Sequence, residues 1–156
     1  MKITILILVL SLTLLTIKEV SSQEWDCETA VQNALELLEE TAEGTVVNTE
    51  PVLSKEIICV PLARNIAGKV VSYKPRTIYI NSQLVRPDWD ILGTIIHEAC
   101  HLDLYEAGFV PRDRESVLLH EKFCSYISLK AIYYLGGPNY LYNQWLLKLK
   151  YPERYW

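Results

Sequence analysis

The sequence predicts an α+β protein in which a small, mostly antiparallel sheet packs on long helices. Four segments are predicted to be helices, residues 25–43, 88–108, 113–135 and 139–150. Three short apolar runs are typical of strands, residues 56–62, 69–73 and 76–81. Glycine and proline punctuate the joins between these segments.

The first helix and the strands come early in the chain. Residues 25–43 carry an apolar stripe at helical spacing, and Gly44 ends it. The run 56–62 contains Ile57, Ile58 and Val60, and the turn-like residues 65–68 follow it. We therefore expect residues 69–73 to pair back on this strand as a hairpin, with residues 76–81 as a third strand.

The later helices have clear boundaries. Pro87 and Asp88 stand where a helix starts, and Gly108 stands where it stops. The helix 113–135 is broken by residues 136–138, which read Gly-Gly-Pro. The last helix, 139–150, is rich in tyrosine, leucine and tryptophan, and we expect it to close the core.

Residues 1–22 are predicted to be a secretory signal. Lys2 precedes an apolar or hydroxyl-bearing stretch, residues 3–17, and Val20-Ser21-Ser22 resembles a cleavage site. This stretch is short for a membrane span, which needs about 20 residues. The expected location is therefore secreted or extracytoplasmic, with an uncleaved anchor formed by residues 3–17 as the alternative. Residues 23–156 form a single predicted domain.

The charge of the chain bears on whether it binds nucleic acids. The formal net charge is −4, and the sequence shows no basic stripe. This balance argues against nucleic-acid binding. Contact with a membrane is expected only if the signal segment is retained.

The most informative motif is His97-Glu98-Ala99-Cys100-His101, an H-E-x-x-H pattern within the helix 88–108. Positions i and i+4 share one face of a helix, so both imidazoles can bind one Zn²⁺. Glu98 can then act as the general base toward a metal-bound water. The motif therefore predicts two zinc ligands and a catalytic carboxylate.

A hydrolytic zinc site needs a third protein ligand. The metzincin pattern is excluded, because Leu104 and Ala107 stand where it has glycine and histidine. Glu121, on the next long helix, is the strongest candidate. His120, Glu115 and Asp113 remain as alternatives, and only one of the neighbours His120 and Glu121 is expected to face the metal.

This arrangement resembles the gluzincins, thermolysin-like zinc metallopeptidases in which a glutamate on the next helix completes the site. The resemblance covers residues 76–138 and implies a minimal zincin-like domain that hydrolyses peptide bonds. Family members often carry an aspartate four residues after this glutamate, and it orients the first histidine through a hydrogen bond. The present chain has Ser125 there, a weaker group for orienting His97. The group that stabilises the oxyanion is left open among His120, Tyr126, Tyr105, Arg112 and Arg114.

All four cysteines follow the signal segment, which favours disulfides in an exported protein. A helix from Cys27 and a returning strand of matching length would bring Cys59 level with Cys27. Cys100 and Cys124 each follow a proposed ligand by three residues, on helices that must meet at the metal. The predicted pairs are Cys27–Cys59 and Cys100–Cys124.

The expected substrate is a peptide or protein that binds along a free edge strand, Thr77–Asn81. Two alternatives stay open. A catalytically silent zincin-like domain would bind a peptide or protein partner at the same strand. A structural zinc module is disfavoured, because such sites are usually closed by four ligands.

Overall fold

The computed structural model describes residues 25–71, 74 and 76–154. The predicted signal segment and residues 72–73 of the predicted second strand lie outside this part. The elements in order are α2 (Cys27–Ala42), α3 (Glu50–Leu53), β1 (Glu56–Val60), β2 (Gly68–Val70), β3 (Thr77–Asn81), α4 (Asp88–Glu106), α5 (Arg114–Tyr134), α6 (Asn139–Lys150) and the 3₁₀ turn η2 (Pro152–Arg154). The predicted α+β class is confirmed, and α3 and η2 are additions to the predicted elements.

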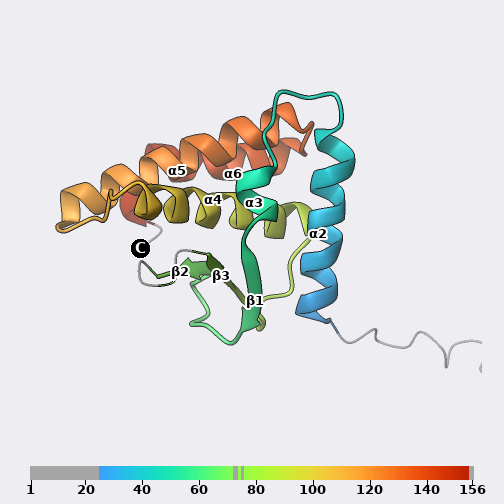
Figure 1. Cartoon of the computed structure of the whole chain (residues 1–156), viewed down its shortest axis with the longest axis horizontal. Coiled ribbons are helices and arrows are strands. Elements are labelled where there is room, and N and C mark those ends of the chain that lie inside the picture. The colour runs from blue at the N-terminus through green and yellow to red at the C-terminus, as the bar shows by residue number, and fades with distance from the viewer. Residues whose placement is uncertain (1–24, 72–73, 75, 155–156) are drawn as a thin grey trace, which may run out of the picture.

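Helix α4 is the centre of the fold. The sheet lies on one side of it, α5 and α6 lie on the other, and α2 runs across one end (Figure 1). Every side chain from Ile91 to Leu102 is buried, including those of the H-E-x-x-H motif. A helix that is apolar around most of its circumference is stable only when neighbours cover all its faces. The ends of α4 are the least covered, as the exposed Glu106 shows.

The sheet is mixed, not mostly antiparallel as predicted. Its order is β1-β3-β2, with β1 parallel and β2 antiparallel to β3. The expected hairpin between residues 56–62 and 69–73 is therefore wrong, since β2 pairs with β3. The strand Thr77–Asn81 is central and offers no free edge, which corrects the expected peptide-binding strand. Its side chains Ile78 and Ile80 are fully buried. Burial of these apolar side chains favours the central position in the sheet, where strands cover this one on both sides.

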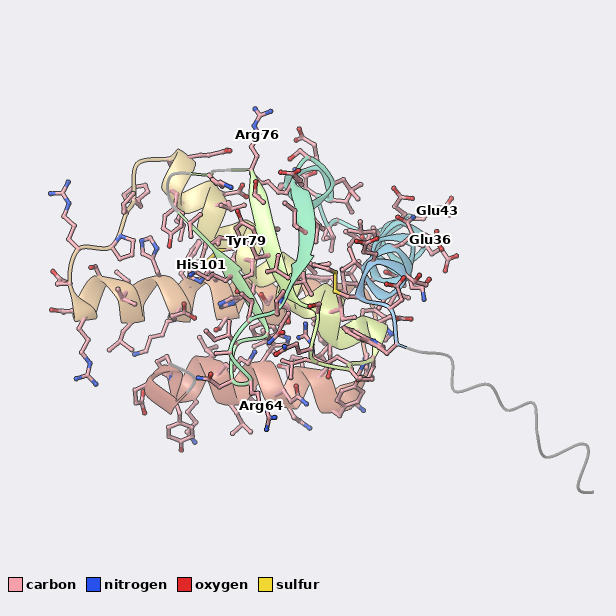
Figure 2. The ribbon with its side chains drawn as sticks, turned by 90° about the horizontal axis from the view of Figure 1, so that it is seen from below. Glu36, Glu43, Arg64, Arg76, Tyr79 and His101 are labelled. Atoms are coloured by element: carbon pink, nitrogen blue, oxygen red, sulfur yellow. A yellow bond between two sulfur atoms is a disulfide. The ribbon has the colours of Figure 1, made fainter. Side chains whose placement is uncertain are left out.

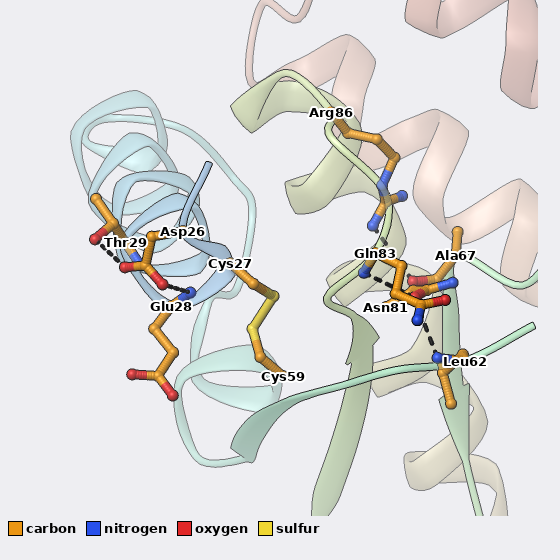
Figure 3. The surroundings of a disulfide bond; sticks show 10 residues. All are labelled: Asp26, Cys27, Glu28, Thr29, Cys59, Leu62, Ala67, Asn81, Gln83 and Arg86. Carbon is orange, nitrogen blue, oxygen red and sulfur yellow. Dashed lines mark hydrogen bonds between the residues drawn. A yellow bond between two sulfur atoms is a disulfide. The ribbon is translucent and has the colours of Figure 1, made fainter. Parts of the chain in front are cut away.

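Both predicted disulfides are present. Cys27–Cys59 joins the first turn of α2 to β1 (Figure 3), and Cys100–Cys124 joins α4 to α5. The bond at Cys27 holds α2 beside an edge strand. The bond at Cys100 links the two helices that carry the candidate metal ligands.

Asn81 organises the loop before β2. Its side chain is fully buried and donates to the carbonyls of Ala63 and Ile66. It accepts from the backbone N–H groups of Leu62 and Gln83 (Figure 3). Buried amides need such partners, because an unpaired one costs about 1–3 kcal/mol. The loop is thereby held against the end of β3, and it leads directly into β2.

Candidate metal centre

The two histidines of the motif converge on one point. His97 and His101 lie one turn apart on α4, with their Nε2 atoms 3.2 Å apart. Both side chains are buried. Their other ring nitrogens, Nδ1, have no hydrogen-bond partner among the described residues. The Nε2 atoms, which lie next to each other, form the edge at which the two rings converge.

Glu121 reaches this edge from α5. Its Oε2 lies 3.1 Å from Nε2 of His97, and its Oε1 lies 3.1 Å from Nε2 of His101. The disulfide Cys100–Cys124 crosses between the same two helices, next to His101 and one turn after Glu121. A covalent link at this point holds the carboxylate opposite the imidazoles.

These three side chains fit a metal ion. Each offers one potential ligand atom, an imidazole nitrogen or a carboxylate oxygen, and these three atoms all lie within 4.8 Å of one another. Two ligands about 2.0–2.1 Å from a shared tetrahedral Zn²⁺ stand about 3.3–3.4 Å apart. The observed 3.1–3.2 Å is close to that spacing. Two imidazoles and one carboxylate also leave a fourth position open, as hydrolytic zinc sites do.

The three residues line a cleft of about 650 Å³. Its walls come from residues 65–70, from one face of α4, and from α5 and α6. Figure 2 shows His101 beside the sheet, whereas Arg76, Glu36 and Glu43 point outward. The cleft therefore gives solvent molecules and a substrate access to an otherwise buried group of ligands.

Glu98 lies beside the ligands in the same cleft and packs against the backbone of β2. A Cβ added at Gly68 would lie 3.1 Å from Cγ and 3.4 Å from Oε1 of Glu98. Burial raises the pKa of the Glu98 carboxyl, although the nearby His97 and His101 act in the opposite direction. A carboxylate with a raised pKa is suited to accept and release a proton near neutral pH.

The carboxyl group of the candidate ligand Glu121 differs from that of Glu98. Burial tends to raise the pKa of Glu121, but hydrogen bonds from His101 and His97 outweigh it and hold this pKa far below its usual range. The pKa of His101 is shifted upward: burial lowers it, and the bond to Glu121 and the charge of Glu98 more than compensate. The surroundings thus keep Glu121 ionised, whereas they favour the uptake of a proton by Glu98.

The remaining candidates from the sequence divide by position. Ser125 and Tyr105 line the cleft, but no side chain of the described residues bonds Nδ1 of His97, so Ser125 does not orient that ring in the expected way. The ring of His120 lies 6.2 Å from that of His101, outside the residues that line the cleft. Tyr126 is exposed on another face of α5, beside Lys130.

The other candidates on this side of the chain lie away from the ligands. Asp113 is the N-cap of α5, and Arg112, Arg114 and Glu115 are exposed. Glu121 is therefore the alternative that the fold brings to the two histidines.

The cleft also contains residues that the sequence-based candidates do not include, among them Gly68, Trp145 and Lys148. The ring of Trp145 packs on His97 at 5.1 Å, and Nζ of Lys148 lies 3.9 Å from the centroid of the Trp145 ring. A glycine within a strand is a signal of close backbone approach, and it could have identified Gly68. No local pattern marks residues of α6 as neighbours of α4.

A second cavity, of about 440 Å³, lies on the opposite side of α4. It is lined mainly by apolar side chains such as Leu38, Ile96 and Phe123. It contains neither Glu98 nor any of the three candidate ligands, so the chemistry is assigned to the first cleft.

Comparisons with protein-family models, with curated proteins and with solved structures find no match to this chain. Its function is therefore inferred from the geometry of the cleft.

Proposed function

We propose that this protein is an exported zinc-dependent peptidase. The observation that carries the proposal is the convergence of His97, His101 and Glu121 in an accessible cleft, with the buried Glu98 beside them. A structural metal site has no use for such a carboxylate, whereas hydrolysis requires a base within reach of the attacking water.

The residues of the chain take distinct roles in this proposal. His97 and His101 bind Zn²⁺ through Nε2, and Glu121 binds it through its carboxylate. When bound, Zn²⁺ supplies a Lewis acid that polarises a carbonyl group and makes water more acidic. Glu98 holds the proton that the attacking water loses, and it delivers this proton to the amine that leaves.

The substrate is proposed to bind along β2, which replaces Thr77–Asn81 in this role. β2 pairs with β3 on one side only, and its three residues line the cleft. An extended peptide can add to such an edge through main-chain hydrogen bonds. This mode accepts many sequences, so the side chains around the cleft would determine preference.

The likeness to zincins supports the same function. In such domains a strand beside the metal helix offers its edge to the substrate, and here β2 lies against α4 at Thr94 and Glu98. The ligand set, two histidines one turn apart and a glutamate on the next helix, is that of the gluzincins. The domain would be a minimal member of that class.

The two disulfides indicate an extracytoplasmic location, because such bonds form and persist in oxidising compartments. Among the described residues, no helix is long and apolar enough to span a bilayer. We propose that the protein is secreted, with anchoring by residues 3–17 as the alternative.

The test is cleavage of a diverse peptide library by the oxidised protein loaded with zinc, with Glu98→Gln as the control. Cleavage by the wild type and none by Glu98→Gln, at equal zinc content, would support a peptidase. If neither protein cleaves but both bind peptides with equal affinity, the protein is a silent binding domain and the proposal fails.

A further inference from the structure

The cleft contains an ammonium group in addition to its carboxylates. Two lysines line it, Lys69 on β2 and Lys148 on α6. Lys69 is exposed, whereas Lys148 is partly buried. The Nζ atom of Lys148 lies 3.9 Å from the centroid of Trp145, whose ring packs on His97 at 5.1 Å. Lys148 and the candidate ligand His97 thus both contact the ring of Trp145.

This position matches a need of the proposed reaction. When the oxygen of water adds to the peptide carbonyl carbon, the π electrons of the carbonyl move onto its oxygen, and the water proton goes to Glu98. The C–N bond then breaks, the carbonyl re-forms, and the amine leaves with the proton from Glu98. A donor aimed at the charged oxygen is commonly worth about 100- to 1,000-fold in kcat.

The sequence-based candidates for this donor are poorly placed. Tyr126 is exposed on α5, and His120 is outside the lining of the cleft. Tyr105 and Lys148 remain, at different positions around the ligands. Only Lys148 carries a full charge, and a charged donor bonds about twice as strongly as a neutral one.

We propose that Lys148 is a catalytic residue whose ammonium group stabilises the oxyanion that forms on the substrate carbonyl oxygen. This proposal rests on the proposed peptidase function. The surroundings of Lys148 suit the role. Its pKa is lowered, because burial disfavours the charge, while the nearby carboxylate of Glu98 acts to retain it. Partial exclusion of water also strengthens any hydrogen bond that the ammonium makes.

The experiment compares Lys148→Met with the wild type and with Lys150→Met as the matched control, because Lys150 is exposed on the same helix and does not line the cleft. Methionine keeps an unbranched apolar side chain against Trp145 and removes the ammonium group. We expect kcat for a library-derived peptide to fall by about 100-fold in Lys148→Met, with KM, zinc affinity and Tm unchanged. Lys148→Arg should recover part of this loss, and Lys150→Met should match the wild type. An unchanged kcat in Lys148→Met would overturn the assignment. A loss of kcat in Tyr105→Phe without any loss in Lys148→Met would assign the role to Tyr105 instead.

A binding measurement keeps the test independent of turnover. An N-phosphoryl dipeptide carries an anionic tetrahedral group like the oxyanion, and the same dipeptide without phosphate does not. Calorimetry should show that Lys148→Met binds the phosphoryl dipeptide at least about 10-fold more weakly, with the plain dipeptide unaffected. Absence of peptide cleavage by the wild type would reject the proposed function. Equal binding of the phosphoryl dipeptide by wild type and Lys148→Met, or none by either, would reject the role of Lys148.

Discussion

Gly68 and Glu98 lie so close that no side chain fits between them. A Cβ at position 68 would stand 2.6 Å from Cγ2 of Thr94 and 3.1 Å from Cγ of Glu98. The edge strand thus sets the position of the proposed general base. This relationship couples the strand proposed to hold the substrate to the residue proposed to activate water.

Gly68→Ala should therefore impair catalysis more than metal binding. The added methyl group would clash with Thr94 and push Glu98 by a few tenths of an ångström. Because a misplacement of about 1 Å can cost about 100-fold in rate, we expect a measurable loss that is smaller than this. Peptide cleavage and zinc affinity should be measured on the same preparation. In the combination Gly68→Ala with Thr94→Ser, the methyl nearest to the added Cβ is gone, so part of the activity should return. A loss of zinc affinity equal to the loss of activity would contradict this account.

Glu121→Gln should lose most of its zinc affinity. The carboxylate contributes negative charge and two oxygens that lie 3.1 Å from the imidazoles. Changes outside the ligand shell already cost about 10- to 100-fold in affinity, so loss of a charged ligand should exceed about 100-fold. Competition with a fluorescent chelator measures this. Glu115→Gln, on an exposed part of the same helix, should bind zinc as the wild type does.

The two disulfides should differ in what their removal changes. Each closes a loop, with sequence separations of 32 and 24 residues, for which the chain-entropy relation gives about 3.5 kcal/mol of stability. Alanine at both Cys100 and Cys124 should also weaken zinc binding, since α5 carries Glu121. Alanine at both Cys27 and Cys59 should lower stability and leave zinc affinity unchanged. Urea unfolding and zinc titration of the two double variants test this, and equal zinc affinities would refute it.

Gly93→Ala should destabilise the protein although alanine favours helices. A Cβ at this position would stand 2.7 Å from Nε1 of Trp145. Overpacking costs about 1–3 kcal/mol, which exceeds the gain of about 1 kcal/mol in helix propensity. Thermal unfolding should show the loss. In a Trp145→Phe background the smaller ring leaves more room, so the same substitution should cost less. A cost that does not change would show that the contact with Trp145 is not its cause.

Asp113 should make stability depend on pH in acid. Its side chain accepts a hydrogen bond from the backbone N–H of Ser116 in a capping box at the start of α5. Bonds to Ser116 lower the pKa of Asp113 below the ordinary value of 3.8. A lowered pKa in the folded state means that the stabilisation is present above the unfolded value and is lost as the pH falls through the folded value.

Asparagine at position 113 caps equally well but does not titrate. Between about pH 5 and pH 3, urea unfolding should show the wild type losing more stability than Asp113→Asn. Parallel pH profiles for the two proteins would contradict the assignment.

Local patterns were sufficient for the helices. The predicted helices at 25–43, 88–108, 113–135 and 139–150 differ from α2, α4, α5 and α6 by no more than two residues at each end. Proline, glycine and capping aspartates mark these ends, and each acts within one turn of the chain. The single-turn helix α3 escaped prediction because its four residues are too few to show a period.

Strand pairing was not accessible in the same way. The strands themselves were predicted, but β2 joins β3 where a hairpin with β1 was expected. Pairing between strands depends on which side chains can be buried together, and the run of residues along one strand does not specify this. The burial of Ile78 and Ile80 against α4 makes β3 central, and the disulfide at Cys59 holds β1 beside α2.

By itself the sequence determined the four long helices and the spacing that places His97 and His101 on one helical face with Glu98 next to them, and it predicted the two disulfide pairs that the structure contains. These features depend on covalent neighbours and on the fixed geometry of a helix. Only the tertiary structure decided that Glu121, in place of His120 or Glu115, faces the histidines, and that Gly68 and Lys148 line the same cleft as Glu98. Contacts between elements far apart in the chain arise from how a whole core packs, because each element accepts several neighbours until burial selects one arrangement.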